Sequence, residues 1–324
     1  MMPSTLPRSL DVAIDIGGTF TDVTLLDRRD GRVWRTKTAS TPQDQSRGFM
    51  TGIEKVLDIA GADLSDIGRI LHATTVATNL ILEGKGASAA LVTSSGFRHV
   101  LEIGRHDIPE SANPHTWTKP ERPIPPERIH EVGGRIDKDG VEIQPLDETG
   151  LRDIARTIAA QGIGSVAVCL LNAYASPAHE LRAGEILAEE LPGAIVSLSS
   201  QILPVFREYE RSMVTILNAY VAPAVSGYVG NLERRIAEKG IDAPLLLMKS
   251  NGGVTSARTI CSQPVQTALS GPAAGVIGAS FFGKLAGYPN IIGIDIGGTS
   301  ADIAVIGGGQ PNMSHESRIT DWPL

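Results

Sequence analysis

The sequence predicts an α/β fold with two related halves, and three observations support this. Segments with strand and helix character alternate along most of the chain, which is typical of layered α/β domains. One short motif, flanked by apolar residues, occurs near both ends of the chain, which indicates a duplication. With 324 residues and 42% hydrophobic content, the chain is long enough for about two domains, each with a sizeable core.

The first part of the chain predicts a β-hairpin followed by alternating strands and helices. Residues 11–27 hold two apolar segments around a Gly-Gly turn, which is typical of a hairpin. Residues 32–40 add a third strand, and Thr41-Pro42 begins a helix that ends at Gly61. The next predicted elements are a strand (70–73), a helix (75–84) and a strand (89–93).

A proline-rich segment separates this part from further alternation. Residues 105–126 contain six prolines and no periodicity, which predicts a long ordered loop or lid. Residues 207–239 predict a long helix that is split or kinked near Pro223, because proline removes a backbone donor. The other predicted elements are a hairpin turn (137–140), helices (147–161, 177–190 and 270–286) and strands (166–171, 194–198 and 245–248).

Composition and charge exclude several classes of protein. A formal net charge of −7 without clusters of like charge argues against binding to nucleic acid or an anionic membrane. The longest apolar run, 166–171, is far shorter than the roughly 18 residues of a transmembrane helix, and residues 1–10 lack the apolar stretch of a signal peptide. The two cysteines, Cys169 and Cys261, exclude a disulfide framework and a Cys-x-x-Cys motif. We therefore expect a cytoplasmic protein.

The repeated motif carries the chemistry. Residues 12–26 (VAIDIGGTFTDVTLL) and 292–306 (IGIDIGGTSADIAVI) share an Asp-Ile-Gly-Gly-Thr-x-x-Asp core at a constant offset of 280 residues (295 − 15). Adjacent glycines let backbone N–H groups approach a phosphate, and the threonine adds a hydroxyl donor. Two such turns that face a shared cleft can hold the β and γ phosphates of ATP.

The residue types assign ATP and Mg²⁺ roles to both copies. Asp15 and Asp295, before the Gly pairs, suit a Mg²⁺ ion that keeps several waters, so they are the predicted catalytic and metal residues. Alternatively, each carboxylate caps its own turn through an Asx hydrogen bond. Asp22 and Asp302 are expected to brace the hairpins. The predicted ATP-binding residues are Gly17, Gly18, Thr19, Thr21, Gly297, Gly298, Thr299 and Ser300.

Six polar residues outside the repeat are candidates for substrate contacts: Thr74, Thr75, Asn79, Arg105, Asn251 and Ser270. The first three open a helix directly after a strand, where free N–H groups can hold an oxygen, although a threonine there can also simply cap the helix. Arg105 can pair with a substrate carboxylate or carbonyl, or anchor its loop through an ion pair. Ser270 opens a helix at either a donor turn or a tight packing turn.

Seven segments then occur in a recognisable order: DIGGTFTD (15–22), HATTVATNLIL (72–82), ALVTSSGFRHVLEIGR (90–105), NAYVAP (218–223), MKSNGGV (248–254), SGPAAGV (270–276) and DIGGTSAD (295–302). Together they resemble the ATP-binding subunit of the hydantoinase A, 5-oxoprolinase and acetone carboxylase family, within the acetate kinase, sugar kinase, heat-shock chaperone and actin superfamily. The resemblance implies a ribonuclease H-like domain of the actin and sugar-kinase type, with only the first hairpin of a second related domain.

The resemblance also implies domain limits. It predicts an N-terminal hydantoinase/oxoprolinase region at 10–190 and the start of a hydantoinase A region at 205–324. In structural terms, a first ATPase domain covers about 10–288 and a truncated second one covers 289–324. Residues 291–324 are then expected to pack on the first domain as a partly exposed element of low local stability, because an isolated hairpin leaves unpaired edges.

The implied reaction is the ATP-dependent phosphorylation of an amide or ketone oxygen. The activated imidate or enol phosphate is then hydrolysed or carboxylated by a second subunit or domain of hydantoinase B type. We therefore expect a subunit of a hydantoinase or 5-oxoprolinase-type enzyme that uses ATP and Mg²⁺ on a small cyclic amide, within an oligomer. Alternatives are a ketone carboxylase subunit, a sugar kinase, for which no sugar-binding signature is present, and a non-catalytic remnant that holds a partner chain.

Overall fold

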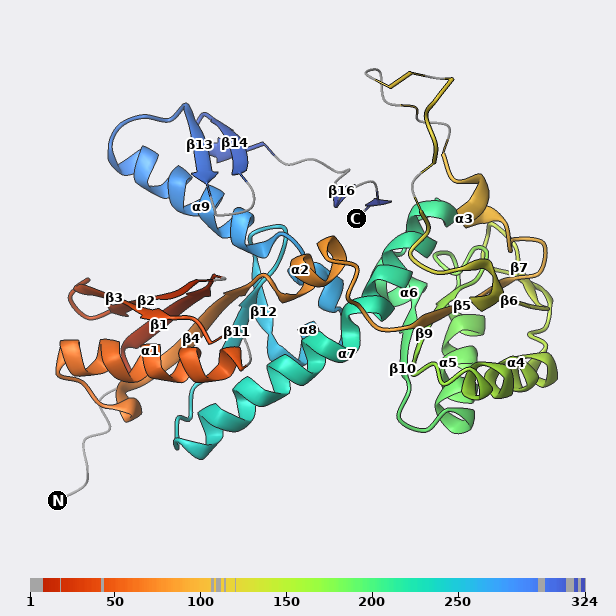
Figure 1. Cartoon of the computed structure of the whole chain (residues 1–324), viewed down its shortest axis with the longest axis horizontal. Coiled ribbons are helices and arrows are strands. Elements are labelled where there is room, and N and C mark those ends of the chain that lie inside the picture. The colour runs from red at the N-terminus through yellow and green to blue at the C-terminus, as the bar shows by residue number, and fades with distance from the viewer. Residues whose placement is uncertain are drawn as a thin grey trace. The chain divides into compact units, whose positions relative to one another are not determined.

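The computed structural model describes residues 8–17, 19–41, 44–105, 108, 112–113, 115–119, 121–296, 301–312, 318–319 and 322–323, which form two compact units (Figure 1). Unit 1 takes the described residues of Met1–Asn79 and Val225–His315, and unit 2 those of Leu80–Ala224 and Glu316–Leu324. This grouping differs from the sequence-based limits at 10–288 and 289–324, which stay a prediction.

Unit 1 is built on a six-stranded sheet in the order β12-β11-β4-β1-β2-β3. Strands β1, β2 and β3 form an antiparallel meander, whereas β4 and β11 pair in parallel on the other side of β1. This is the ribonuclease H-like arrangement that we expected. The strands are β1 (Leu10–Ile16), β2 (Phe20–Asp27), β3 (Val33–Ala39), β4 (Ile67–Thr74), β11 (Leu245–Met248) and β12 (Val254–Ser256).

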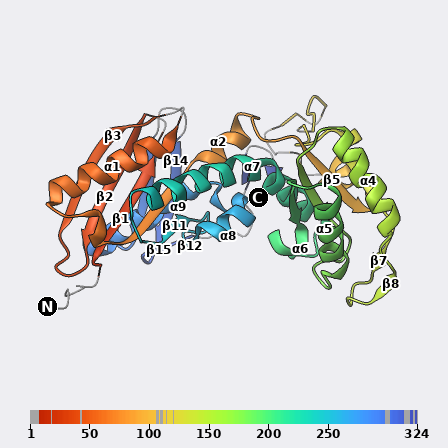
Figure 2. The same cartoon turned by 90° about the horizontal axis from the view of Figure 1, so that it is seen from below.

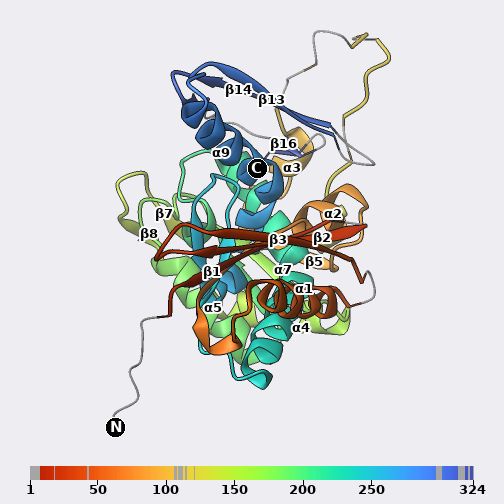
Figure 3. The same cartoon turned by 90° about the vertical axis from the view of Figure 1, so that its left-hand side faces the viewer.

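Alternation along β1 and β2 buries one face of the meander under α1 (Gln45–Ala60). The inward residues of β1 are apolar, and those of β2 include Val23, which α1 approaches so closely that a Cβ on Gly52 would come within 2.5 Å of its Cγ2 atom. The helix is capped by the Asp44 side chain and ends at Gly61, whose φ of 65° favours glycine. Figure 3 shows α1 on one face of β1–β3, with α9, β13 and β14 on the side of the other.

The second copy of the motif forms a hairpin of its own on α9. Its strands pair in the same register as β1 and β2, so that Asp295 lies opposite Asp302 as Asp15 lies opposite Asp22. The remaining elements of unit 1 are α8 (Ala257–Ser262), α9 (Ser270–Leu285), β13 (Ile291–Ile296), β14 (Ala301–Gly307) and β15 (Gln310–Pro311), with the short η1 (Leu64–Asp66) and η3 (Pro264–Thr267).

Unit 2 is a parallel sheet in the order β10-β9-β5-β6 with helices on both faces. Its elements are β5 (Ala89–Ser94), β6 (Ile129–Val132), β9 (Ser165–Cys169), β10 (Ile195–Leu198), α3 (Val100–Ile103), α4 (Glu148–Ala160), α5 (Ala178–Glu190), α6 (Ser199–Ile202), η2 (Pro126–Arg128) and the hairpin β7 (Arg135–Ile136) and β8 (Glu142–Gln144). Helices α4 and α5 lie side by side against this sheet (Figure 1 and Figure 2).

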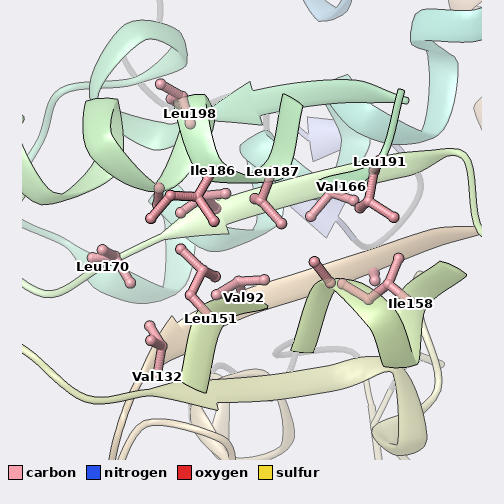
Figure 4. Close-up of a cluster of buried hydrophobic side chains, with 14 of the residues drawn as sticks. Val92, Val132, Leu151, Ile158, Val166, Leu170, Ile186, Leu187, Leu191 and Leu198 are labelled. Carbon is pink, nitrogen blue, oxygen red and sulfur yellow. The ribbon is translucent and has the colours of Figure 1, made fainter. Parts of the chain in front are cut away.

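Alternating side chains give the parallel sheet two cores. On one face, Val92 and Val166 pack with side chains of α4 and α5 such as Leu151 and Ile186 (Figure 4). On the other face, the neighbouring strand residues pack against the unit 2 part of α7 (Glu208–Glu238), including Ile216. Both faces are covered, as is usual for parallel sheets.

Helix α7 is not split at Pro223, because it runs through this residue as one helix of 31 residues, and a kink there stays a prediction. Proline leaves the carbonyl four residues earlier, that of Ala219, without its helical donor. The Ser165 hydroxyl supplies the missing hydrogen bond over 2.5 Å. The next carbonyl, that of Tyr220, accepts a hydrogen bond from Ala87 N at 2.8 Å. The hydroxyl of Ser165 therefore replaces the backbone donor that Pro223 lacks.

Helix α7 also bears on the expectation that no segment of the chain is long and apolar enough to cross a membrane. By length and composition alone, α7 is apolar enough to cross a membrane, although the sequence has no long uninterrupted apolar run. However, 67% of its most apolar window is buried inside the protein, as in a core helix.

The last described residues belong to unit 2. Strands β16 (Arg318–Ile319) and β17 (Trp322–Pro323) pair with each other, and the Trp322 indole donates to the carbonyl of Glu121 at 2.9 Å. The predicted appended element at 291–324 is thus divided between the two units. In the described part of 105–126, the chain forms neither helix nor strand before η2, as predicted for a loop.

Candidate functional site

The first Gly-Gly turn joins β1 to β2 and is held by Ser40, the residue that follows β3. Gly17 N–H donates to the carbonyl of Phe20 at 2.9 Å, and a Cβ on Gly17 would come within 3.1 Å of the same oxygen. Ser40 holds the turn twice, through its hydroxyl to the Gly17 carbonyl at 2.7 Å and its N–H to the Thr19 carbonyl at 2.9 Å. Because the Gly17 N–H is engaged, the exposed Thr19 is the described residue that offers this turn's donors to a ligand.

Thr21 lies on the opposite face from the acidic residues. Its side chain is fully buried toward α1, next to Gly48, and its hydroxyl lies 3.2 Å from that of Ser40. The alternation of β2 therefore makes Thr21 a brace for the turn. The structure does not bring it together with Asp15.

Asp15 and Asp22 are direct cross-strand neighbours on the exposed face of the hairpin. Asp22 has a cation partner, since the Lys37 ammonium lies 3.2 Å from it and also stacks over the Phe20 ring at 5.2 Å. Among the residues that the structure describes, Asp15 has neither an ion pair nor an Asx hydrogen bond. The described contacts therefore do not support the alternative in which Asp15 caps its turn.

The pKa of Asp15 depends on the second copy of the motif. Desolvation by neighbouring protein atoms raises the pKa of Asp15 although its side chain reaches solvent, and the charges of Asp22 and Asp295 raise it further. Asp295 is exposed on β13 and faces Asp302 across its own hairpin. Acidic residues from both copies thus interact electrostatically within unit 1. Gly18 and residues 297–300 lie outside the described residues.

This arrangement suits a cation that is bound largely through water. No set of three His, Cys, Asp or Glu side chains closes around a common point in the described parts of the chain. The carboxylates instead concentrate negative charge that a hydrated Mg²⁺ ion would neutralise, because Mg²⁺ usually keeps several waters and takes only one or two carboxylates.

Two of the predicted substrate residues meet at the end of β4. Thr74 is buried, its hydroxyl accepts from Val76 N–H at 3.3 Å, and its carbonyl accepts from the buried Ser270 hydroxyl at 3.0 Å. Thr75 follows and is half-buried, and a Cβ on Gly271 would be 3.8 Å from its methyl group. Thr74 and Ser270 therefore join α2 (Val76–Leu82) and α9 to the sheet, and Thr75 is the more accessible hydroxyl.

The other three candidates are engaged in contacts within the protein. Asn79 is exposed and its amide lies 3.4 Å from the Thr75 hydroxyl. The Asn251 side chain accepts from Gly253 N–H at 3.0 Å within its own turn. Arg105 lies in unit 2, where it forms a two-fold ion pair with Glu210 at 2.8 and 2.6 Å. Loop anchoring, the alternative role of Arg105, is therefore the one that the contacts support.

A buried network behind Asp15 was not expected from the sequence. His72 Nδ1 lies 3.0 Å from the carbonyl of Ile14, and its Nε2 lies 2.6 Å from the Tyr228 hydroxyl. Burial lowers the pKa of His72 to about 4, so the ring is neutral with its proton on Nδ1, and Tyr228 donates to Nε2. Burial also raises the pKa of Tyr228, against a hydrogen bond from Thr74. His72 lies in one of the seven segments of the family resemblance. No local pattern in the sequence of α7 indicates that Tyr228 contacts it.

Family models match almost the whole chain. The model for the hydantoinase/oxoprolinase N-terminal region matches residues 11–191, and the hydantoinase/oxoprolinase model matches residues 211–324. The chain belongs to the hydantoinase/oxoprolinase family. Its similarity to relatives extends over both matched regions, which confirms the resemblance inferred from the seven motifs.

The curated relatives are considerably longer than this chain. Caprolactamase subunit alpha of Pseudomonas jessenii is 31% identical over 312 residues, which cover 94% of this chain and 44% of that subunit. Acetone carboxylase beta subunit of Xanthobacter autotrophicus is 29% identical, with coverage of 94% and 44%. 5-Oxoprolinase 1 of Arabidopsis thaliana is 30% identical, with coverage of 94% and 26%. The chain thus spans less than half the length of these relatives.

Solved structures confirm the fold. A nucleotide-free acetone carboxylase structure, described under a mechanism of ATP-dependent acetone carboxylation, matches with a TM-score of 0.87 and 28% identity over 98% of this chain and 46% of that one. The ATP-dependent caprolactamase from Pseudomonas jessenii matches with a TM-score of 0.80 and 30% identity over 91% and 43%. The α/β fold of the actin and sugar-kinase type is therefore established for this family member.

Proposed function

We propose that this chain supplies ATP-binding residues to an ATP-dependent enzyme that activates the carbonyl oxygen of a small cyclic amide. The observation that carries the proposal is that the charge of Asp295, from the second copy of the motif, raises the pKa of Asp15, from the first copy, within unit 1. Carboxylates of the two copies that interact in this way can serve the same triphosphate, and the titles of two solved relatives name ATP-dependent reactions.

Each residue of the site has a proposed role that follows from its chemistry. Asp15 and Asp295 hold a hydrated Mg²⁺ ion through its waters, which offsets the charge of the phosphates. Thr19 offers donors to a phosphate oxygen, because the Gly17 N–H is already bound to Phe20 and Ser40 holds the carbonyls of Gly17 and Thr19. When bound, ATP supplies the phosphoryl group that turns the carbonyl carbon into a target for water. Thr75 is the residue best placed to position the substrate near the end of β4.

Subsequent ring opening belongs to a partner of hydantoinase B type in this proposal. Relatives carry the names of alpha, beta and gamma subunits, which supports a multi-subunit enzyme. Because the chain spans less than half of these relatives, the complete activity is that of the assembled protein.

A ketone carboxylase subunit is the second candidate. Acetophenone carboxylase gamma subunit of Aromatoleum aromaticum is 33% identical to this chain, slightly more than the caprolactamase subunit at 31%. The acetone carboxylase structure also superposes over more of the chain. In that case, the activated ketone takes up a carboxyl group instead of water.

Isothermal titration calorimetry tests the ATP site. We expect the chain to bind ATP with Mg²⁺ present and to lose most of that affinity in EDTA; titration without any magnesium-dependent heat would contradict the proposal. For the Asp15→Asn variant, Asp30→Asn provides a matched control, because Asp30 is an exposed turn residue that contacts Arg32.

The substrate class is tested by a second experiment. Phosphate release is measured in the assembled enzyme with 5-oxoproline, hydantoin or caprolactam, and separately with acetone or acetophenone plus bicarbonate. Stimulation by the ketones alone would favour the carboxylase.

A further inference from the structure

Lys37 lies on the same exposed face of the sheet as the candidate ATP site. Strand pairing places Asp15 opposite Asp22, and Asp22 opposite Lys37, so the three side chains form one row across β1, β2 and β3. All three residues are exposed, and strand alternation directs the residues on either side of them to the other face, which α1 covers. An ammonium group therefore ends the row that begins with a proposed Mg²⁺ residue.

Two contacts hold the Lys37 ammonium near the first Gly-Gly turn. It lies 3.2 Å from a carboxylate oxygen of Asp22 and 5.2 Å from the centre of the Phe20 ring. Phe20 begins β2 and lies one row nearer the turn than Asp22. The main chain of Lys37 is held as well, since its carbonyl accepts a hydrogen bond from the Lys55 ammonium at 2.9 Å. The ammonium is thus directed toward the turn.

Fold stability does not account for this arrangement. The side chains of Lys37 and Asp22 are 54% and 56% exposed. An ion pair between two side chains in water contributes little to the free energy of unfolding, because solvent screens the charges and both side chains lose rotamer entropy. Removal of the Lys37 ammonium should therefore leave unit 1 folded, which makes its role at the site accessible to experiment.

The charges at the site favour an anionic ligand for Lys37. Asp22 and Asp295 act electrostatically on Asp15, so three carboxylates share the site, and Mg-ATP is itself an anion. Mg²⁺ offsets part of this negative charge, and a cation of the protein is needed for the rest. Lys37 is the cation whose described ion pair lies on this row. An ammonium has three N–H donors and commonly binds phosphate, so it can contact a phosphate while Asp22 holds it.

We propose that Lys37 is a further ATP-binding residue, whose ammonium donates to an oxygen of the β or γ phosphate when Mg-ATP binds at the first Gly-Gly turn. This inference rests on the function proposed above. Asp22 is then a positioning residue that holds the ammonium beside the phosphates, and Phe20 keeps it on the side of the turn. Together with Mg²⁺, Lys37 offsets the negative charge of the phosphoryl group during transfer.

An acyl phosphate of ATP tests the position of Lys37. A lysine amine beside the phosphates attacks the acyl carbon of this reagent, an amide bond forms, ATP leaves with the electron pair of the broken C–O bond, and the amine proton passes to water. Mass spectrometry should find the amide on Lys37. Excess Mg-ATP or Mg-tripolyphosphate should prevent the labelling, whereas adenosine should not.

Lys55 and Lys239 are the controls for this labelling, because both are exposed in the same unit. Their slower reaction should not change when Mg-ATP is added. Labelling of Lys37 that Mg-ATP does not reduce would overturn the proposal.

Calorimetry of variants provides a second test. Lys37→Met should weaken the binding of Mg-ATP by about tenfold or more at an unchanged melting temperature, and Lys37→Arg should restore part of the affinity because it keeps the charge. Arg35→Met is the matched control, since Arg35 is exposed on the same strand and face, one row farther from the turn. Its loss should change the affinity by less than about threefold, because water and salt screen a charge that does not contact the ligand. Equal losses in the two methionine variants would contradict a contact between Lys37 and phosphate.

The same titrations distinguish the role of Lys37 from the proposed function. If the unaltered chain shows no magnesium-dependent binding and no protected lysine, both proposals are wrong. If the unaltered chain and Lys37→Met bind Mg-ATP equally well, the ATP site stands and the role of Lys37 is rejected.

Discussion

The hydroxyl of Tyr228 donates a hydrogen bond to Nε2 of the buried His72 over 2.6 Å, directly behind the strand that carries Asp15. The other ring nitrogen bonds the carbonyl of Ile14. A neutral histidine thus connects α7 to β1, next to the candidate site.

The stability of unit 1 should depend on the protonation of His72. The pKa of His72 is about 4 in the folded protein and 6.5 when unperturbed. Between these two values, the unfolded chain binds a proton that the folded chain does not bind. Stability from this group is constant above about pH 7 and falls toward pH 4. Between pH 7 and 5 the loss should be about 2 kcal/mol. Urea unfolding at several pH values measures it, and His72→Gln should remove this part of the slope. An unchanged slope in the variant would contradict the assignment.

Tyr228→Phe should destabilise unit 1 at neutral pH. The substitution keeps the ring but leaves His72 Nε2 buried without a donor, which costs about 1–3 kcal/mol. Tyr288→Phe is the matched control, because Tyr288 is 68% exposed in the same unit. Thermal unfolding should separate the two variants, and equal melting temperatures would show that the hydrogen bond adds nothing.

Asp15→Asn should affect stability and ligand binding in opposite directions. The raised pKa means that ionised Asp15 is disfavoured in the folded state, so the contribution of this group to stability is greatest at low pH and is lost as pH rises through its folded-state pKa. The neutral asparagine should therefore keep or raise the melting temperature at pH 7. The same change should weaken Mg-ATP binding by about tenfold or more, because a charge-assisted contact is lost. Parallel loss of stability and binding would instead indicate a structural role.

Sequence reasoning succeeded where the information was local. The duplicated motif located both hairpins, because an apolar segment on each side of a Gly-Gly turn is a local signal. Strand alternation could have placed Thr21 on the face opposite Asp15, since it precedes Asp22 by one residue. Lys37 and Tyr228 could not be found in this way, because the pairing of β3 with β2 and the packing of α7 bring them in from elsewhere.

Pro223 shows the limit of local rules most clearly. Proline usually breaks a helix because it removes a donor and crowds the preceding turn. Here the freed carbonyl of Ala219 meets the hydroxyl of Ser165, which is 54 residues away in the sequence and lies on β9. No sequence pattern around Pro223 predicts that Ser165 supplies this hydrogen bond.

Ser165 and Pro223 should therefore be energetically coupled. Ser165→Ala should cost about 1–3 kcal/mol in the natural chain, because the buried carbonyl of Ala219 then has no donor. In a Pro223→Ala background, the restored N–H of residue 223 can donate to that carbonyl, so Ser165→Ala should cost little. Urea unfolding of the four proteins gives the coupling energy as a double-mutant cycle. Additive effects would mean that the serine stabilises unit 2 through some contact other than the one that replaces the missing donor of Pro223.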